Sequence, residues 1–224
     1  MKTKDLHSWD LTYADARRLQ MRLAERVRRR PLRMAVRTAA GLDCAFDKPN
    51  GKALAVVVVL SFPELDVIET ASVGVDLTFP YIPGLLSFRE APVCLAAVEK
   101  LQTTPDLFLI DGQGIAHPRR LGLAAHLGLF LDRPTIGCAK SRLIGTYDPP
   151  KQEKGSHTPL LDGTDIIGAV VRTRTGVKPL FVSCGHLCTL QDAIEWTLRL
   201  TTRYRLPEPT RLAHRQVTAL KKGI

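Results

Sequence analysis

Three carboxylates occupy positions in this sequence where acids could act together. Asp43 interrupts a strand-like stretch of small and apolar residues, and Asp111 ends the apolar stretch 107–110. Glu90 follows a stiff loop and opens an expected helix. An unpaired buried carboxylate is costly, so a partner must compensate each one. If the two strands are neighbours, Asp43 and Asp111 project side by side, and a helix that crosses that edge can bring Glu90 to meet them.

Converging carboxylates repel one another unless a divalent cation lies between them, and hard oxygen ligands favour Mg²⁺ or Mn²⁺. Such an ion can hold a phosphodiester, orient a water molecule and stabilise the leaving oxygen. For each acid alone, a helix cap or a salt bridge is the more ordinary interpretation. The three acids together favour a metal site that acts on a phosphodiester.

The stretch ahead of Glu90 predicts a rigid loop that carries an aromatic side chain. Prolines at positions 80 and 83 fix their own φ angles and lack backbone donors, so the Tyr-Ile pair between them is held stiffly. Ser87 and Glu90 have the S-x-x-E spacing of a capping box, which predicts a helix that begins near residue 88. The alternative is a plain proline turn with a capping glutamate.

Composition bounds the class of protein and of partner. The chain has 224 residues, the length of one domain, and 45% of them are hydrophobic, enough for a large core. A net charge of +10 and a pI near 9.7 predict a polyanionic partner, most simply nucleic acid. Neither a signal peptide nor a long apolar run is visible, so we expect a soluble, cytoplasmic protein that does not engage membranes.

The five cysteines are scattered and odd in number, which favours free thiols in a reducing compartment over a disulfide framework. Cys184 and Cys188 flank His186 in what could pass for half of a zinc site. No second Cys/His pair at finger spacing accompanies them, so a structural role is favoured.

Hydrophobic periodicity and turn signals predict the elements. We expect helices over residues 12–30, 88–102, 119–131, 189–203 and 209–221. We expect strands over residues 36–46, 53–62, 67–77, 107–112, 135–139, 165–172 and 179–183, with a turn at 48–51 and a polar surface excursion over 145–163. A three-stranded antiparallel meander followed by β-α-β units makes an α/β fold, a mixed sheet with helices on both faces. No internal repeat or long linker divides residues 1–224, so we expect a single domain.

Several long motifs, in order from about residue 12 to 221, resemble the endonuclease V family, which has an RNase H-like fold. They are GLD at 41–43, PYIPG at 80–84, SFRE at 87–90, DGQGIAHPRR at 111–120, TIGCAKS at 135–141, SCGH at 183–186 and LPEPTRLAH at 206–214. The chain departs from the family's usual residues at Cys138, Cys184, Leu187 and Cys188, none of which is a proposed ligand.

The resemblance implies roles for residues at matching positions. Asp43, Glu90, Asp111 and His214 match the metal site, with Asp43 and Asp111 as direct ligands. Lys140 matches a lysine placed to contact the scissile phosphate or the attacking water. The implied cofactor is Mg²⁺, for which Mn²⁺ can substitute.

The resemblance also implies how damaged DNA is held. The wedge that separates the strands at the damaged base matches Pro80, Tyr81, Ile82 and Pro83, and a stiff aromatic loop suits that task. The pocket for the flipped base is expected near Gly84, Leu85, Leu86, Gly112, His117, Gly122 and Leu123. His117 and His186 could equally be core residues or phosphate contacts.

The expected activity is Mg²⁺-dependent nicking of DNA at the second phosphodiester bond 3′ to deoxyinosine, which leaves 3′-OH and 5′-phosphate ends and serves DNA repair. Two alternatives stay open: an endoribonuclease specific for inosine, and a non-catalytic binder of deaminated nucleic acid. The presence of Asp43, Glu90 and Asp111 argues against the binder. The expected partner is DNA that contains deoxyinosine, bound by a monomer.

Overall fold

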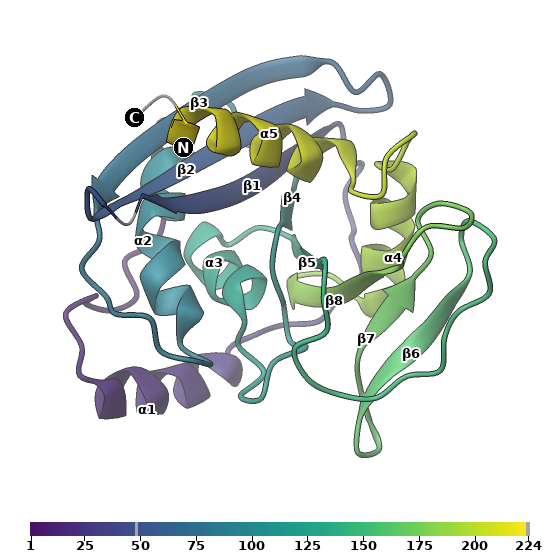
Figure 1. Ribbon diagram of the computed structural model, residues 1–224, viewed down its shortest axis with the longest axis horizontal. Coiled ribbons are helices and arrows are strands. Elements are labelled where there is room, and N and C mark those ends of the chain that lie inside the picture. The colour runs from purple at the N-terminus through teal and green to yellow at the C-terminus, as the bar shows by residue number, and fades with distance from the viewer. Residues whose placement is uncertain (48, 223–224) are drawn as a thin grey trace.

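A computed structural model describes residues 1–47 and 49–222 of the protein. The helices are α1 (Tyr13–Ala24), α2 (Leu86–Glu99), α3 (Leu123–Leu131), α4 (Leu190–Arg199) and α5 (Glu208–Lys222). The strands are β1 (Thr38–Asp47), β2 (Lys52–Ser61), β3 (Val67–Asp76), β4 (Leu107–Ile110), β5 (Thr135–Ala139), β6 (His157–Asp162), β7 (Asp165–Val171) and β8 (Leu180–His186). The strands form one mixed sheet in the order β3-β2-β1-β4-β5-β8-β7-β6 (Figure 1).

The first half of the sheet is the expected antiparallel meander. β1 pairs with β2 and β2 with β3, all antiparallel. The β-branched run in β2 is buried on both faces, because alternate side chains enter different layers. Val57 and Val59 pack with α2 in one layer, whereas Val56 and Val58 pack against α5 in the other.

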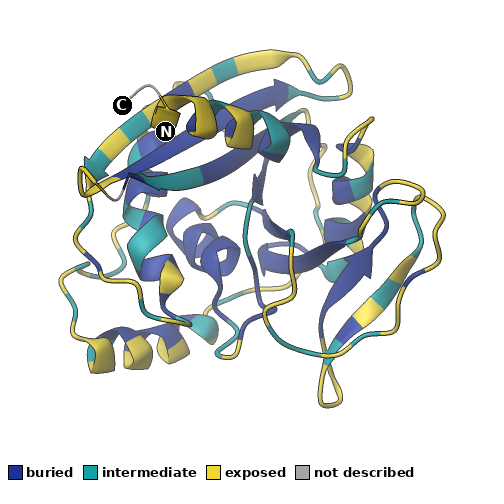
Figure 2. Ribbon diagram, in the orientation of Figure 1, coloured by how far each residue is buried: buried dark blue, intermediate teal, exposed yellow. Residues whose placement is uncertain are grey.

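Helices cover both faces of the sheet, as expected. α2 and α3 pack on one face, and α4 and α5 lie on the opposite face. α1 packs outside this arrangement, against α2 and α3 (Figure 1). The buried residues in Figure 2 follow these layers through the centre of the molecule. This architecture confirms the predicted fold class.

The centre of the sheet places two acids at one edge. β1, β4 and β5 run parallel, and Leu42 lies opposite Ile110 in the register. Asp43 and Asp111 therefore follow neighbouring strand positions at the edge where β4 ends, although β1 itself continues to Asp47. Crevices at this edge are where open α/β sheets bind ligands.

α5 approaches β1 closely enough that only glycine fits between them. A Cβ atom on Gly41 would lie 2.0 Å from the carbonyl carbon of Pro209, which no real packing permits. The glycine lets the helix lie directly on the strand that carries Asp43. His214, five residues after Pro209 on α5, is thereby brought to within 2.7 Å of Asp43 Oδ2.

Three expected helices are shorter than predicted, and the fourth of the five ends at Arg199 and not at residue 203. The first ends at Ala24 and not at residue 30, because the following backbone pairs with the turn after β8. There the Arg28 amide donates to His186 Nδ1, and the Leu187 amide donates to the Arg28 carbonyl. The third begins at Leu123 and not at residue 119, since the preceding residues form a turn.

The predicted capping box is wrong. α2 begins at Leu86, its N-cap is Leu85, and no side chain caps it. Ser87 lies within the first turn, and its hydroxyl bonds to His126 instead of a backbone amide of the helix. The hydroxyl group that the sequence pattern assigned to the helix cap is therefore bonded to His126, a residue distant in the chain.

The surface excursion over 145–163 was also an incomplete prediction. Its second half contains β6, which forms a hairpin with β7 at the edge of the sheet. Pro159 and the polar residues around it hid this strand, because proline is tolerated only on edge strands. The expected turn at 48–51 includes Lys48, which lies outside the described residues; β1 and β2 pair on either side of it. Within the described chain, no helix is both long and apolar enough to cross a membrane.

The close approach at Gly41 predicts the effect of a single methyl group. We expect Gly41→Ala to destabilise the protein by ~3 kcal/mol, because the methyl group must push α5 away from β1. Urea unfolding followed by circular dichroism measures this change. Gly74→Ala is the matched control, since its Cβ lies 3.1 Å from the flexible tip of Leu54 and 3.9 Å from the Ala53 carbonyl oxygen, an ordinary contact. Equal, small effects of both substitutions would contradict the packing argument.

Candidate active site

Three potential ligand groups meet where β4 ends beside the middle of β1. The carboxylates of Asp43 and Asp111 and a ring nitrogen of His214 offer ligand atoms that all lie within 4.8 Å of one another. The acids come from adjacent parallel strands and the histidine from α5. Three of the predicted site residues are thus brought together by the fold.

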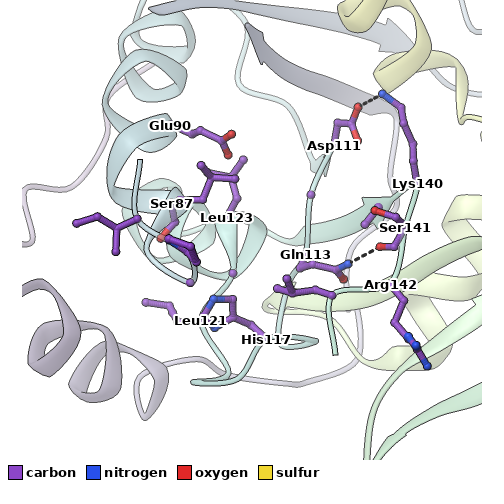
Figure 3. Close-up of a pocket in the computed structure, with 18 of the residues that line it drawn as sticks. Ser87, Glu90, Asp111, Gln113, His117, Leu121, Leu123, Lys140, Ser141 and Arg142 are labelled. Atoms are coloured by element: carbon purple, nitrogen blue, oxygen red, sulfur yellow. Dashed lines mark hydrogen bonds and ion pairs between the residues drawn. The ribbon is translucent and has the colours of Figure 1, made fainter. Parts of the chain in front are cut away.

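Hydrogen bonds fix the orientation of this cluster. Asp43 Oδ1 accepts from the backbone amide of Cys44 at 2.8 Å, and its Oδ2 lies 2.7 Å from His214 Nδ1. Asp111 Oδ2 accepts from the ammonium group of Lys140, which follows β5 (Figure 3). Lys140 Nζ also lies 3.4 Å from His214 Nδ1. A fourth predicted residue, Lys140, therefore belongs to the same group.

Burial and neighbouring charge raise the pKa values of Asp43 and Glu90. Burial, followed by the nearby charge of Asp111, raises the pKa of Asp43, against the opposing effect of the hydrogen bond from His214. Burial also raises the pKa of Glu90 to about 8, helped by the charges of Asp43 and Asp111. Glu90 projects from α2 toward this edge and shares the lining of a pocket with Asp111 (Figure 3).

The donor set fits a hard divalent cation. Two carboxylates and an imidazole nitrogen are within reach of one point, and a third carboxylate lies beside them in the pocket wall. Such a concentration of negative charge in a partly buried edge is stabilised by a cation. In this structure the Lys140 ammonium and His214 supply part of that compensation.

A pocket of about 420 Å³ adjoins the cluster. Its walls include the predicted residues Gly84, Leu86, Gly112, His117, Gly122 and Leu123, together with Tyr81, Ile82 and Pro83. Of the predicted pocket residues, Leu85 is placed differently: its side chain is fully buried in the core formed with α1 and α3. In the predicted wedge, Tyr81 is 69% exposed, as an inserting side chain requires.

The loop over 80–84 is held at both ends by arginines. Arg89 Nη1 donates to the Phe79 carbonyl at 2.9 Å, just before the loop. Arg119 Nη2 donates to the Gly84 carbonyl at 2.6 Å, and the buried amide of Gln20 donates to the same oxygen at 3.0 Å. Gly84 has a φ of +79°, which favours glycine. The loop is therefore fixed by its carbonyl groups, which its prolines leave available.

Some pocket residues were missed by sequence reasoning. They are Ser87, Gln113, Leu121, Ala139, Ser141, Arg142 and Leu143. Gln113 Nε2 donates to the Ser141 carbonyl at 3.0 Å, while its buried Oε1 lacks a partner among the described residues. A polar residue between two glycines, directly after a strand that ends in Asp111, was the available signal.

The histidines left undecided by the sequence separate in the structure. His117 is buried in the pocket wall, where burial lowers its pKa to about 4. His186 is buried at the turn after β8, where its Nδ1 accepts from the Arg28 amide. Cys184 and Cys188 are also buried, and no three-ligand cluster within the described residues includes them.

The raised pKa of Glu90 predicts how stability depends on pH. In the unfolded chain a glutamate titrates near about pH 4.3, so between that pH and about 8 folding takes up a proton. The free energy of unfolding of the metal-free protein should therefore fall as pH rises through this window, by up to about 1 kcal/mol per pH unit.

Urea unfolding at a series of pH values, with a chelator present, measures that slope. Glu90→Gln cannot titrate, so the difference between the wild type and this variant isolates the Glu90 contribution. Glu153→Gln, at an exposed position, is the control and should keep the wild-type slope. Identical slopes in the wild type and Glu90→Gln would show that Glu90 is ionised in the folded protein.

Comparisons with known proteins agree on one family. A family model described as Endonuclease V matches residues 21–215. An endonuclease V from Nostoc punctiforme is 50% identical over 214 residues, which cover 95% of this chain and 97% of that protein. One from Gloeobacter violaceus is 51% identical over 221 residues, covering 97% and 90% of the two chains.

Solved structures agree with these sequences. The endonuclease V from Bacillus subtilis superposes with a TM-score of 0.95 at 33% identity, covering 100% of this chain and 98% of that one. The Ciona intestinalis endonuclease V, solved in complex with a 24mer DNA containing an inosine followed by a ribo-adenosine, gives a TM-score of 0.82 at 29% identity. That match covers 94% of this chain and 98% of the other. By its sequence, its RNase H-like fold and its acidic edge, this chain belongs to the endonuclease V family.

Proposed function

We propose that this protein is a Mg²⁺-dependent endonuclease that nicks DNA at the second phosphodiester bond 3′ to deoxyinosine. The observation that carries the proposal is the meeting of Asp43, Asp111 and His214 beside a pocket that the 80–84 loop overhangs. The net charge of +10 suits a nucleic-acid substrate. The Ciona relative, solved with inosine-containing DNA, supports the choice of lesion.

In this proposal Asp43, Asp111 and His214 hold the cation, with Glu90 beside them. When bound, the ion supplies Lewis-acid stabilisation of the phosphodiester and of the water that attacks it. Lys140, held by Asp111, presents its ammonium group to the scissile phosphate. To hold the ion, His214 would present a ring nitrogen that carries no proton, whereas in this structure its Nδ1 lies 2.7 Å from Asp43 Oδ2.

Tyr81 and its neighbours would open the duplex. The loop presents an exposed aromatic ring between two prolines, and both of its ends are hydrogen-bonded to arginines. A ring held this firmly replaces a stacked base at little entropic cost. The displaced base enters the pocket, whose 420 Å³ suffices for a purine.

The metal-site assignment predicts that substitution of a ligand removes the nicking activity but leaves lesion binding intact. We expect Asp111→Asn to lower the single-turnover nicking rate of a deoxyinosine duplex by more than about a hundredfold, because a ligand charge is lost. Lesion binding, measured by fluorescence anisotropy without metal, should persist. Asp76→Asn, an exposed acid on β3, is the control and should nick normally.

Matched substrates separate the proposed activity from its alternatives. An undamaged duplex and an RNA with inosine are tested alongside, each with Mg²⁺ and with EDTA. Normal nicking by Asp111→Asn would overturn the metal site. Cleavage of the RNA alone would make the protein a ribonuclease, and binding without any nick would make it a binding protein.

The assignment of Tyr81 to a wedge predicts a loss of binding with little change in the rate of the chemical step. We expect Tyr81→Ala to weaken binding of the deoxyinosine duplex by about tenfold or more, since stacking of a base on an aromatic ring is lost. Its single-turnover rate at saturating protein should change much less. Tyr13→Ala, which removes an exposed tyrosine from α1, is the control. A rate at saturation that falls as far as the affinity does would count against a wedge.

A further inference from the structure

A chain of side-chain hydrogen bonds runs from the N-terminal segment to the wall of the pocket. His7 Nδ1 lies 2.8 Å from the Ser8 carbonyl oxygen, and His7 Nε2 lies 2.9 Å from His126 Nε2. His126 Nδ1 in turn lies 3.1 Å from Ser87 Oγ. Ser87 lines the pocket and is only 4% exposed (Figure 3). Neither histidine has a part in the proposed reaction.

The outer end of the chain fixes the tautomer of His7. A carbonyl oxygen only accepts hydrogen bonds, so His7 Nδ1 must carry the proton that it shares with Ser8. A neutral imidazole has one N–H group, so His7 Nε2 then presents a lone pair. This nitrogen can only accept from its partner, His126.

Both rings are neutral at ordinary pH. They lie in an aromatic cluster with Trp9, Phe88 and Phe130, where the charged imidazolium form is poorly solvated. Burial lowers the pKa of His7 and lowers that of His126 to about 3. Each ring therefore has one donor and one acceptor nitrogen.

The tautomer of His7 determines the tautomer of His126 and the direction of the hydrogen bond to Ser87. Because His7 Nε2 accepts, His126 Nε2 must carry the proton between the two rings. His126 Nδ1 is then a lone pair, and it can only accept from the hydroxyl group of Ser87. The single hydroxyl proton of Ser87 is thus committed to His126. Toward any other neighbour, Ser87 Oγ offers only lone pairs.

We infer that the His7–His126 pair makes Ser87 an obligate acceptor in the pocket wall, where it accepts the ring N1–H of an extruded hypoxanthine. This inference rests on the proposed function. Gln113, another residue of the pocket wall, has an Oε1 atom that is buried and lacks a partner among the described residues. Because its proton is committed to His126, Ser87 Oγ can pair with an occupant only where that occupant offers a donor such as an N–H group.

A Ser87 hydroxyl that can only accept hydrogen bonds toward the pocket would disfavour the binding of adenine. Hypoxanthine has a donor at N1, whereas adenine has a lone pair there. An acceptor-only hydroxyl that faces N1 attracts the first and repels the second, and an unpaired buried acceptor is penalised as well. His7 and His126 are in this account positioning residues, because they act on the base only through Ser87.

The tautomers themselves can be measured without substrate. Nitrogen-15 NMR of histidine-labelled wild-type protein distinguishes the two neutral imidazole tautomers by their ring nitrogen shifts. We expect His7 as the Nδ1–H form and His126 as the Nε2–H form. Single His→Asn variants at each position assign the signals. An Nδ1–H form of His126 would overturn the inference, because Ser87 would then be free to donate.

Binding of matched probes tests the contact with the base. We expect Ser87→Ala to bind a deoxyinosine duplex about fivefold more weakly than the wild type does. Its affinity for a duplex with deoxynebularine, a purine with a lone pair at N1, should not fall. Ser72→Ala, at an exposed position on β3, is the control for both probes.

The outcomes separate this inference from the function on which it rests. A wild type that neither binds nor nicks a deoxyinosine duplex would refute the proposed function, whatever the tautomers are. A wild type that nicks, combined with equal losses of Ser87→Ala on both probes, would refute only the role of Ser87. If Ser87→Ala loses affinity for the deoxyinosine duplex alone, and the tautomers are as expected, the results would support both the chain of hydrogen bonds and the contact of Ser87 with the base.

Discussion

The repulsion between two carboxylates organises this structure. Asp43 and Asp111 are forced together because they follow the same register position on adjacent parallel strands. The protein does not separate them; it surrounds them with Lys140 and His214, and it leaves their edge of the sheet open to a pocket. A site that holds this much negative charge is prepared for a cation. Burial first, and the neighbouring carboxylates second, raise the pKa values of Asp43 and Glu90.

The positioning of that charge depends on distant parts of the chain. His214 reaches Asp43 because α5 lies directly on β1, and α5 can do so because position 41 has no side chain. Lys140 reaches Asp111 because β5 runs parallel to β4 and ends at the same edge. The sheet therefore supplies the acids, while the elements that follow it supply the groups that balance them.

The sequence predicted best what local pattern and strand pairing determine. The order of elements was sufficient for the mixed sheet. The apolar stretch that Asp43 interrupts and the one that Asp111 ends predicted an acidic edge, on the condition that the two strands are neighbours. Side chains whose role depends on contacts with residues distant in the chain were assigned wrongly or were missed. Ser87 had the spacing of a cap, yet its hydroxyl bonds to His126, 39 positions along the chain. Gln113 was overlooked, because its burial and its unpartnered oxygen exist only once β4 and β5 are paired.

Edge elements were misjudged for a different reason. β6 carries a proline and polar side chains because only one of its sides is paired, so its composition resembled that of a loop. The basic residues after α1 continued a helical pattern, but hydrogen bonds to the turn after β8 stopped the helix. In both cases a neighbouring element decided the conformation.

The hydrogen bonds that anchor the 80–84 loop determine which partner deforms when a lesion is recognised. Phe79 and Gly84 are held by Arg89 and Arg119, so bending of the loop around an intact duplex would break these hydrogen bonds. In the proposed function the nucleic acid must then deform, and its own resistance to unpairing sets the cost of engagement. The protein would therefore sense mechanical weakness of the helix before it inspects the base, so a poorly paired purine is presented to the pocket more often than a well-paired one.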